Sequence, residues 1–231
     1  MRYDWIFFDA DGTLFDYDAA EAAALEGAFE ACGLPFAPEI GPLYSEINAG
    51  IWRDFELGRV SQQDLKTARF DRLFDAVGIT ADAAEFSRRY LAILGTQTSL
   101  LDGAESLVRS LVGEVRMLLI TNGLAEVQVP RFAASSIRDC FAEIVISGEI
   151  GLAKPDPEIF DFAFERIDRP ARDRVLMIGD NLGSDILGGA NYGLDTCWYN
   201  PQGLANGHGV EPTYEVRELD EILVIVDGRD T

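Results

Sequence analysis

The sequence contains few of the residues on which disulfide, metal–thiolate or histidine chemistry depends. Its three cysteines are scattered, and they fit neither a metal-site spacing nor a disulfide framework. Reduced thiols in a cytoplasmic protein are the simplest interpretation. The single histidine, His208, lies between two glycines, and we assign it no role. The apolar runs are far too short to span a bilayer, and no secretory leader pattern is present, so we expect a cytoplasmic location.

Positive charge is also scarce. The 19 basic residues face 40 acidic ones, which gives a net charge of −21, and only Lys66 and Lys154 are lysines. Such a surface repels nucleic-acid backbones and anionic lipids, so we expect neither a nucleic-acid polymer nor a membrane as a partner. An acidic protein that binds a phosphate ester needs a local positive centre, which a divalent cation and one well-placed lysine would supply.

The hydrophobic pattern predicts a first strand followed by a long helical segment. Residues 2–8 are aromatic and β-branched, as is typical of a buried strand. No strand signal appears between residues 16 and 95. That segment instead shows helical spacing and capping residues, which predict helices at 19–31, 38–57, 62–77 and 82–94.

From residue 96 onward, short apolar strands alternate with helices. Strands are predicted at 116–120, 143–147, 174–178 and 196–199, and helices at 103–111, 125–135, 157–167 and 184–192. This alternation is typical of a parallel sheet covered on both faces. We therefore predict an α/β fold: a doubly wound, Rossmann-like core of residues 1–15 and 96–231, with a helical cap of residues 16–95 inserted after the first strand.

Polar residues follow several of these strands directly. In open parallel sheets, ligands bind at the carboxyl ends of the strands, so these residues are expected to gather at one edge. They occur in four short motifs, which are Asp9-Ala10-Asp11-Gly12-Thr13, Thr121-Asn122-Gly123, Lys154-Pro155 and Gly179-Asp180-Asn181-Leu182-Gly183-Ser184-Asp185.

Phosphoryl transfer requires this set of groups. A phosphomonoester is a dianion, so an anionic nucleophile cannot approach it until charge is neutralised. Asp9, Asp180 and Asp185 are oxygen donors of the kind that Mg²⁺ prefers. Phosphate oxygens are expected to bind Lys154 and the hydrogen-bond donors of Thr121 and Asn122. Asp11 is placed to protonate the leaving group and then to activate water.

Each motif alone has an ordinary structural explanation. Paired aspartates often cap helices or form turns, Thr-Asn-Gly is a common turn sequence, and Lys-Pro can belong to a solvated loop. The four motifs in this order, each after its own strand, are far harder to explain by coincidence.

On these motifs the sequence resembles the haloacid dehalogenase (HAD) superfamily of aspartate-nucleophile phosphatases, over essentially the whole chain and including a helical cap. The resemblance implies that Asp9 is the nucleophile and a Mg²⁺ ligand. It implies that Asp11 is the general acid/base and binds Mg²⁺ through its backbone carbonyl. The other implied roles are phosphate binding by Thr121 and Lys154 and metal binding by Asp180 and by Asp185, directly or through water.

Three segments are similar to the branch of pyrimidine-preferring 5′-nucleotidases within that superfamily. They are residues 5–11, 184–189 and 195–200. The resemblance implies a small-molecule phosphomonoester as the partner, a pyrimidine (deoxy)nucleoside monophosphate in the first place. A monomer or homodimer is expected.

Several rival functions share parts of this pattern. A phosphatase for sugar phosphates or phosphoglycolate would have the same core and a different cap. A dehalogenase needs neither metal nor an acid at Asp11, and a phosphonate hydrolase would need a cap lysine, for which Lys66 is the one candidate. A receiver domain, from a different class, would be about half as long and without a cap. An inactive binding protein is disfavoured because no expected catalytic residue is missing.

The cap is expected to choose the leaving group. Its segment 48–55 combines an amide, aromatic rings and a glycine, which could stack a planar base and bond its edge. Asn48 and Trp52 are therefore the predicted substrate contacts. The alternative is that Trp52 and Phe55 pack only within the cap, and we favour that reading for Phe55.

Overall fold

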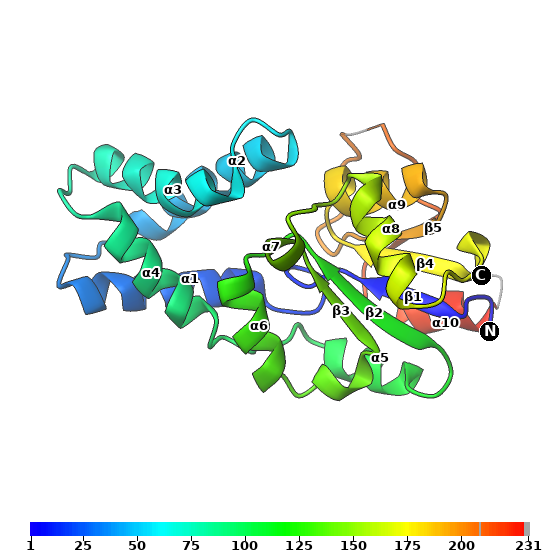
Figure 1. Cartoon of the computed structure of the whole chain (residues 1–231). Coiled ribbons are helices and arrows are strands. Elements are labelled where there is room, and N and C mark those ends of the chain that lie inside the picture. Colours follow the sequence, from blue (N-terminus) through cyan, green and yellow to red (C-terminus); the bar gives the residue numbers. More distant parts are fainter. Residues whose placement is uncertain (208, 229–231) are drawn as a thin grey trace.

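The chain is described here from a computed structural model, which places residues 1–207 and 209–228 (Figure 1). His208 lies outside the described residues. Within them, six strands form one parallel sheet in the order β3-β2-β1-β4-β5-β6. The strands are β1 (Trp5–Phe8), β2 (Arg116–Thr121), β3 (Glu143–Ile146), β4 (Val175–Gly179), β5 (Asp195–Tyr199) and β6 (Tyr214–Val216).

Helices cover both faces of this sheet, because successive strand residues point to opposite sides. On one face, Ile6 and Phe8 belong to an apolar cluster with α5 (Ala104–Leu111) and α10 (Glu221–Asp227). On the other face, Phe7 packs in a second cluster with α8 (Pro157–Arg166). The helix α9 (Leu187–Tyr192) completes that layer. The predicted doubly wound α/β fold is confirmed.

Four helices lie between β1 and α5, at the carboxyl end of the sheet (Figure 1). They share an apolar cluster of their own, to which Leu124 and Val127 of the core contribute. The helices are α1 (Tyr17–Cys32), α2 (Ile40–Glu56), α3 (Gln62–Val77) and α4 (Ala83–Leu94). We call them the cap.

Local sequence fixes where the cap helices begin and end. The Ser61 hydroxyl accepts the N–H of Asp64 at the start of α3, and the Asp82 carboxylate accepts two N–H groups at the start of α4. Gly78 ends α3 in the left-handed conformation that favours glycine. The chain passes from core to cap before α1 and returns to the core after α4. These two connecting segments lie side by side, and the Asp16 N–H donates to the Ser99 carbonyl at 3.1 Å.

The remaining elements are short. They are α6 (Ala125–Ala134), α7 (Ser147–Ile150), 3₁₀ turns at Arg138–Cys140 and Arg172–Arg174, and a π-turn at Leu182–Ile186. The pattern at 184–192 predicted one helix, which the structure divides between the π-turn and α9. The edge strand β6, together with α7 and α10, was not predicted. No helix among the described residues is long and apolar enough to cross a membrane.

Candidate active site

The register of the sheet brings the predicted residues to one edge. β1 is paired with β2 on one side and β4 on the other, and Phe8 lies opposite Leu119 and Ile178. The Asp9 N–H donates to the Ile178 carbonyl at 2.9 Å, so the strand pairing extends one residue further. The strand order reverses between β1 and β4, which is where ligands bind in sheets of this topology.

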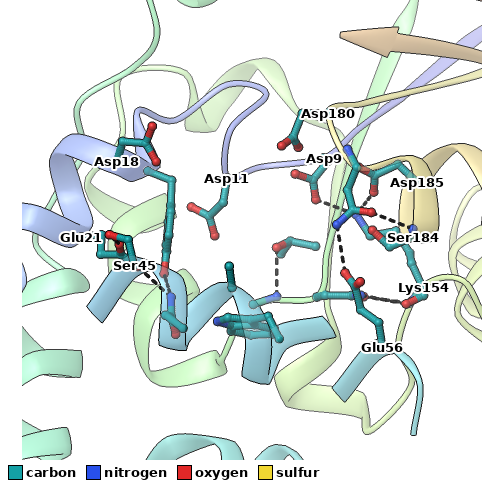
Figure 2. Close-up of a pocket in the computed structure, with 18 residues that line it drawn as sticks. Asp9, Asp11, Asp18, Glu21, Ser45, Glu56, Lys154, Asp180, Ser184 and Asp185 are labelled. Carbon is teal, nitrogen blue, oxygen red and sulfur yellow. Dashed lines mark hydrogen bonds and ion pairs between the residues drawn. The ribbon is translucent and has the colours of Figure 1, made fainter. Parts of the chain in front are cut away.

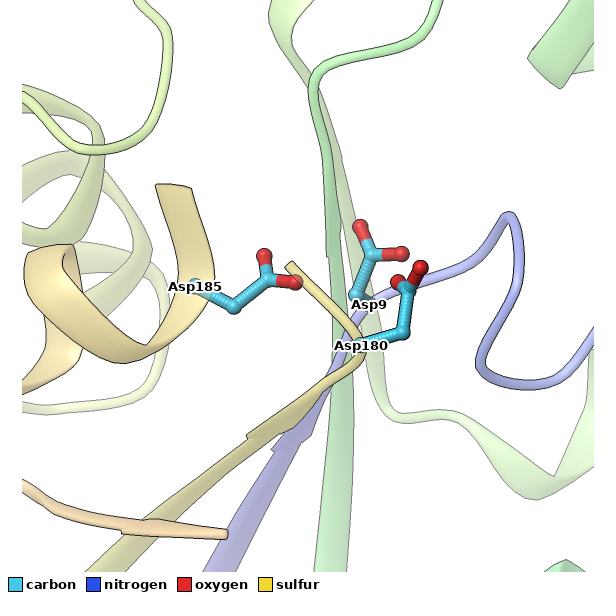
Figure 3. Close-up of side chains that lie close together, drawn as sticks. All are labelled: Asp9, Asp180 and Asp185. Carbon is cyan, nitrogen blue, oxygen red and sulfur yellow. The ribbon is translucent and has the colours of Figure 1, made fainter. Parts of the chain in front are cut away.

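Three carboxylates meet at this point (Figure 3). One oxygen from each of Asp9, Asp180 and Asp185 lies within 4.8 Å of the others. Asp9 and Asp185 are buried, whereas Asp180 is exposed and accepts the Thr13 hydroxyl at 3.2 Å. Gly179 leaves the space for this cluster, because a Cβ atom there would lie 2.1 Å from Oδ2 of Asp185.

The π-turn after β4 presents Asp185. The Asn181 side chain caps this turn by accepting the N–H groups of Gly183 and Ser184 at 2.8 and 3.1 Å. The Asn181 N–H in turn donates to Oδ2 of Asp185 at 3.1 Å. Single π-turns occur often at functional sites, and this one turns Asp185 back toward the end of β1.

Lys154 supplies the positive charge at the cluster. Its Nζ lies 2.6 Å from Oδ1 of Asp9 and 2.7 Å from Oδ1 of Asp185. The Asn122 side chain holds the lysine loop, since it accepts the Lys154 N–H at 2.7 Å and donates to the Lys154 carbonyl at 2.8 Å. Burial alone would lower the pKa of Lys154, but Asp185 and Asp9 outweigh it and raise the pKa above the usual range.

The charge balance of the cluster fits a divalent cation. Burial raises the pKa of Asp9 well above its usual range, and Lys154 does not offset the effect. Three carboxylates against one ammonium group leave two negative charges at formal ionisation. Hard oxygen donors with that excess charge suit Mg²⁺, and a bound cation would favour the ionised Asp9. The three carboxylates therefore fit the Mg²⁺ ion that the sequence predicted.

Asp11 is held on the side of the cavity between Asp9 and the cap (Figure 2). Its carboxylate accepts the Gln128 amide at 2.6 Å and pairs with Arg131, which is fully buried. Arg131 also donates to the carbonyl of Leu94, the last residue of the cap, at 3.3 Å. The sequence motifs gave no sign of Gln128 or Arg131, because both lie on α6 outside any of the four motifs.

The predicted phosphate-binding groups lie on the same cavity wall. The Thr121 hydroxyl oxygen accepts the Gly123 N–H at 3.0 Å, which leaves the hydroxyl hydrogen for a ligand. The Asn122 amide donates one hydrogen to the Lys154 carbonyl, and its second hydrogen is available to a ligand. The main contribution of Asn122 in this structure is therefore to hold the lysine loop.

A cavity of about 440 Å³ joins this edge of the sheet to the cap (Figure 2). Seven carboxylates and one lysine line it, so its wall is strongly anionic. Both predicted cap contacts, Asn48 and Trp52, belong to the lining. Trp52 is half-buried and packs edge-to-face against Phe55 at 5.7 Å, so it meets both the cavity and the cap interior. Phe55 does not line this cavity.

The cap adds acidic residues that sequence analysis missed. Glu21 and Ser45 line the cavity from α1 and α2. Glu56, the last residue of α2, accepts the Asn181 side-chain amide at 3.1 Å and so links cap to core. Burial and the nearby Asp185 raise the pKa of Glu56 to about 7. The signal for Glu21 was a charged residue within an alanine-rich apolar helix face.

Comparison with known proteins agrees with this geometry. Residues 3–193 match the family of haloacid dehalogenase-like hydrolases. YfnB of Bacillus subtilis, a HAD-hydrolase, is 37% identical over 230 residues, which cover 100% of this chain and 98% of YfnB. Its crystal structure, bound to magnesium, superposes with a TM-score of 0.93 over 98% of this chain and 100% of that chain.

Two further relatives carry a named activity. The pyrimidine 5′-nucleotidase YjjG of Escherichia coli is 36% identical over 96% of this chain and 97% of its own length. The pyrimidine 5′-nucleotidase PynA of Streptococcus pneumoniae is 36% identical over 98% of this chain and 96% of its own length. With the fold, the strand-end carboxylates and these matches, the chain belongs to the haloacid dehalogenase-like hydrolases.

Proposed function

We propose that this enzyme is a Mg²⁺-dependent phosphatase that hydrolyses pyrimidine (deoxy)nucleoside 5′-monophosphates through an aspartyl-phosphate on Asp9. The observation that carries the proposal is the continuous cavity. It places the Asp9 cluster and the Lys154 ammonium at one end and the polar and aromatic cap residues at the other. Its volume of about 440 Å³ lies in the range usual for small-molecule sites. The two relatives named pyrimidine 5′-nucleotidases support the substrate class.

The reaction proceeds in two steps. Asp9 forms an oxygen–phosphorus bond as the bond to the nucleoside oxygen breaks, and Asp11 gives its proton to that oxygen. Water then attacks the phosphorus, its proton passes to Asp11, and the carboxylate of Asp9 is released. Lys154 and Thr121 bind phosphate oxygens throughout. Asp9, Asp180, Asp185 and the Asp11 carbonyl would hold Mg²⁺, which would supply the positive charge that lets the dianionic substrate enter.

Asp11 has to change partners during this cycle. Its pairing with Arg131 and Gln128 suits the ionised carboxylate, which is the form that accepts a proton from water. The first step needs the protonated form facing the leaving oxygen. We therefore assign the arrangement seen here to the carboxylate before protonation.

A substrate panel tests the proposal. Turnover of dUMP, dTMP, dAMP, several sugar phosphates and phosphoglycolate is measured with Mg²⁺ and after exhaustive chelation. We expect turnover to require the metal and to favour the two pyrimidine nucleotides. Equal kcat/KM for dUMP, dAMP and sugar phosphates would refute the substrate class, and full activity after chelation would refute the metal.

A second experiment tests the nucleophile. Asp9→Asn should abolish turnover, because an amide neither attacks phosphorus nor binds the metal well. Asp71→Asn, an exposed change on α3, is the matched control and should stay active. Trapping of phosphoenzyme from labelled substrate should place the label on Asp9. Label on Asp11 would overturn the assignment of the two roles.

A further inference from the structure

Three polar side chains of the cap, Glu21, Asn48 and Ser45, form a hydrogen-bonded group at the cap end of the cavity, and the first two of them are buried. Glu21 is 6% exposed, and Asn48 beside it is 2% exposed. Both line the cavity together with Ser45, and Figure 2 shows Glu21 and Ser45 across the cavity from Asp9. Buried polar groups in a helical cap are costly unless they are paired, so their arrangement is informative.

The side-chain donors of Asn48 and Ser45 bond to Glu21 and Tyr17. Asn48 donates one amide hydrogen to Oε1 of Glu21 at 2.7 Å and the other to the Tyr17 hydroxyl at 3.0 Å. Ser45 donates its hydroxyl hydrogen to Oε2 of Glu21 at 2.5 Å. Both amide hydrogens of Asn48 are therefore used, and the predicted direct contact of that amide with a base has no free donor.

Glu21 can still accept hydrogen bonds from a ligand. Each of its oxygens accepts one bond and can accept a second. Both oxygens therefore act as acceptors toward the neighbouring side chains. A carboxylate acceptor at this place attracts an N–H group and disfavours a ligand edge made only of carbonyl oxygens, or a second phosphate.

Arg69 stabilises this buried carboxylate from behind. The guanidinium is 1% exposed, donates to Oδ1 of Asn48 at 2.9 Å, and lies over the rings of Phe70 and Tyr90 at 5.0 Å each. Its Nε and Nη2 have no hydrogen-bond partner among the described residues. Burying a cation with two unsatisfied donors is unfavourable by itself, and the anionic Glu21 beyond Asn48 offsets that cost.

We propose that Glu21 selects the base by accepting a hydrogen bond from its ring N–H, the N3–H of uracil or thymine. Ser45 and Asn48 hold the carboxylate for this contact, and the Trp52 ring on the same cavity lining suits a flat base better than a sugar. The inference rests on the proposed nucleotidase function and names which residue reads the base.

The test is a double-mutant-type cycle, in which two substrates are compared in two proteins. The value of kcat/KM is measured for dUMP and for its N3-methyl analogue, with wild type and with the isosteric Glu21→Gln. The clash of the added methyl group is common to both proteins, so a change in the preference reports the hydrogen bond. A charged acceptor forms roughly twice as strong a bond as a neutral one, and we expect the preference for dUMP to shrink about tenfold in Glu21→Gln.

Matched controls keep the result decisive. Glu26→Gln, an exposed change on the same helix, should retain the wild-type preference. Should Glu21→Gln fail to fold, Glu21→Asp gives the same comparison. The shorter side chain moves the carboxylate away from the base by the length of one methylene group, which weakens the hydrogen bond. An unchanged preference in the folded variant, or a wild type that hydrolyses both substrates equally, overturns the inference alone. A wild type that does not favour dUMP over sugar phosphates overturns the proposed function as well.

Discussion

Removal of the Lys154 charge should make the stability of this protein depend on Mg²⁺. The ammonium is buried against Asp9 and Asp185, at 2.6 and 2.7 Å. Lys154→Met keeps most of the side-chain volume and deletes the charge. Two buried carboxylates are then left without a cation, and breaking a buried pair in this way costs about 3–5 kcal/mol.

The loss should be visible in thermal unfolding. For a domain of about this size, 1 kcal/mol corresponds to roughly 2–4 °C in Tm, so the metal-free variant should unfold roughly 6–20 °C below wild type. Mg²⁺ binding at the same carboxylates restores a cation. An ion present at 100 times its Kd stabilises by about 2.7 kcal/mol, and more in the variant than in wild type if the ion replaces the missing charge.

The measurement is Tm of both proteins in chelator and in millimolar Mg²⁺. We expect the deficit of the variant to narrow when Mg²⁺ is added and when the pH is lowered toward 5, since protonation also removes the uncompensated charge. The other lysine gives the control: Lys66 pairs with Glu126 at the surface, so Lys66→Met should change stability by less than about 1 kcal/mol, with no metal dependence. An equal deficit with and without Mg²⁺ would refute the argument.

Three further changes test other parts of the site. In Gly12→Ala, the positive φ of 82° and a Cβ only 2.7 Å from Oδ2 of Asp180 should displace that carboxylate, the proposed metal ligand. We expect a higher Mg²⁺ concentration for half-maximal activity, and an unchanged Mg²⁺ titration would contradict this. Asp11→Asn should lower kcat by about 10²-fold or more while Asp9 can still be phosphorylated from p-nitrophenyl phosphate, whose leaving group needs no proton; absence of any phosphoenzyme would argue against the acid/base role. The pKa of Glu56 rises from an ordinary 4.5 to about 7, so the folded metal-free protein binds its proton more tightly than the unfolded chain, and stability falls as pH rises between these values. The Tm of Glu56→Gln should therefore fall less than that of wild type between pH 5 and pH 8. An equal fall of Tm with pH in both proteins would contradict the raised pKa of Glu56.

The core of the site was predictable because sequence position and spatial position coincide at strand ends. Asp9 follows β1, and Asp180 follows β4, the neighbouring strand in register with it. Once the strands were recognised, the parallel topology alone placed these residues together. The fold class followed from the same alternation of short apolar strands and helices.

The cap side of the site was less predictable for a physical reason. Which face of a helix meets the cavity depends on how the cap packs on the core, and hydrophobic periodicity does not report that. Glu21 nevertheless leaves a trace, because it lies three and four residues before Ala24 and Leu25 on the buried face of α1. A charged residue on an apolar face is a buried group that needs a partner. The same reasoning applies to Arg69, four residues from both Leu65 and Leu73 on α3.

The three fully buried basic side chains among the described residues show how these parts are related. Lys154 pairs with Asp9 and Asp185, and Arg131 pairs with Asp11. Arg69 reaches Glu21 through a single intervening amide. In a chain of net charge −21, each buried cation thus stabilises an acid that lines the same cavity. Lys154 itself lines the cavity, whereas Arg131 and Arg69 lie outside its lining, so seven carboxylates face one ammonium group and the wall stays anionic. We expect a phosphate dianion to enter together with added positive charge. The proposed requirement for a divalent cation therefore rests on the whole arrangement of the cavity as well as on the three strand-end carboxylates.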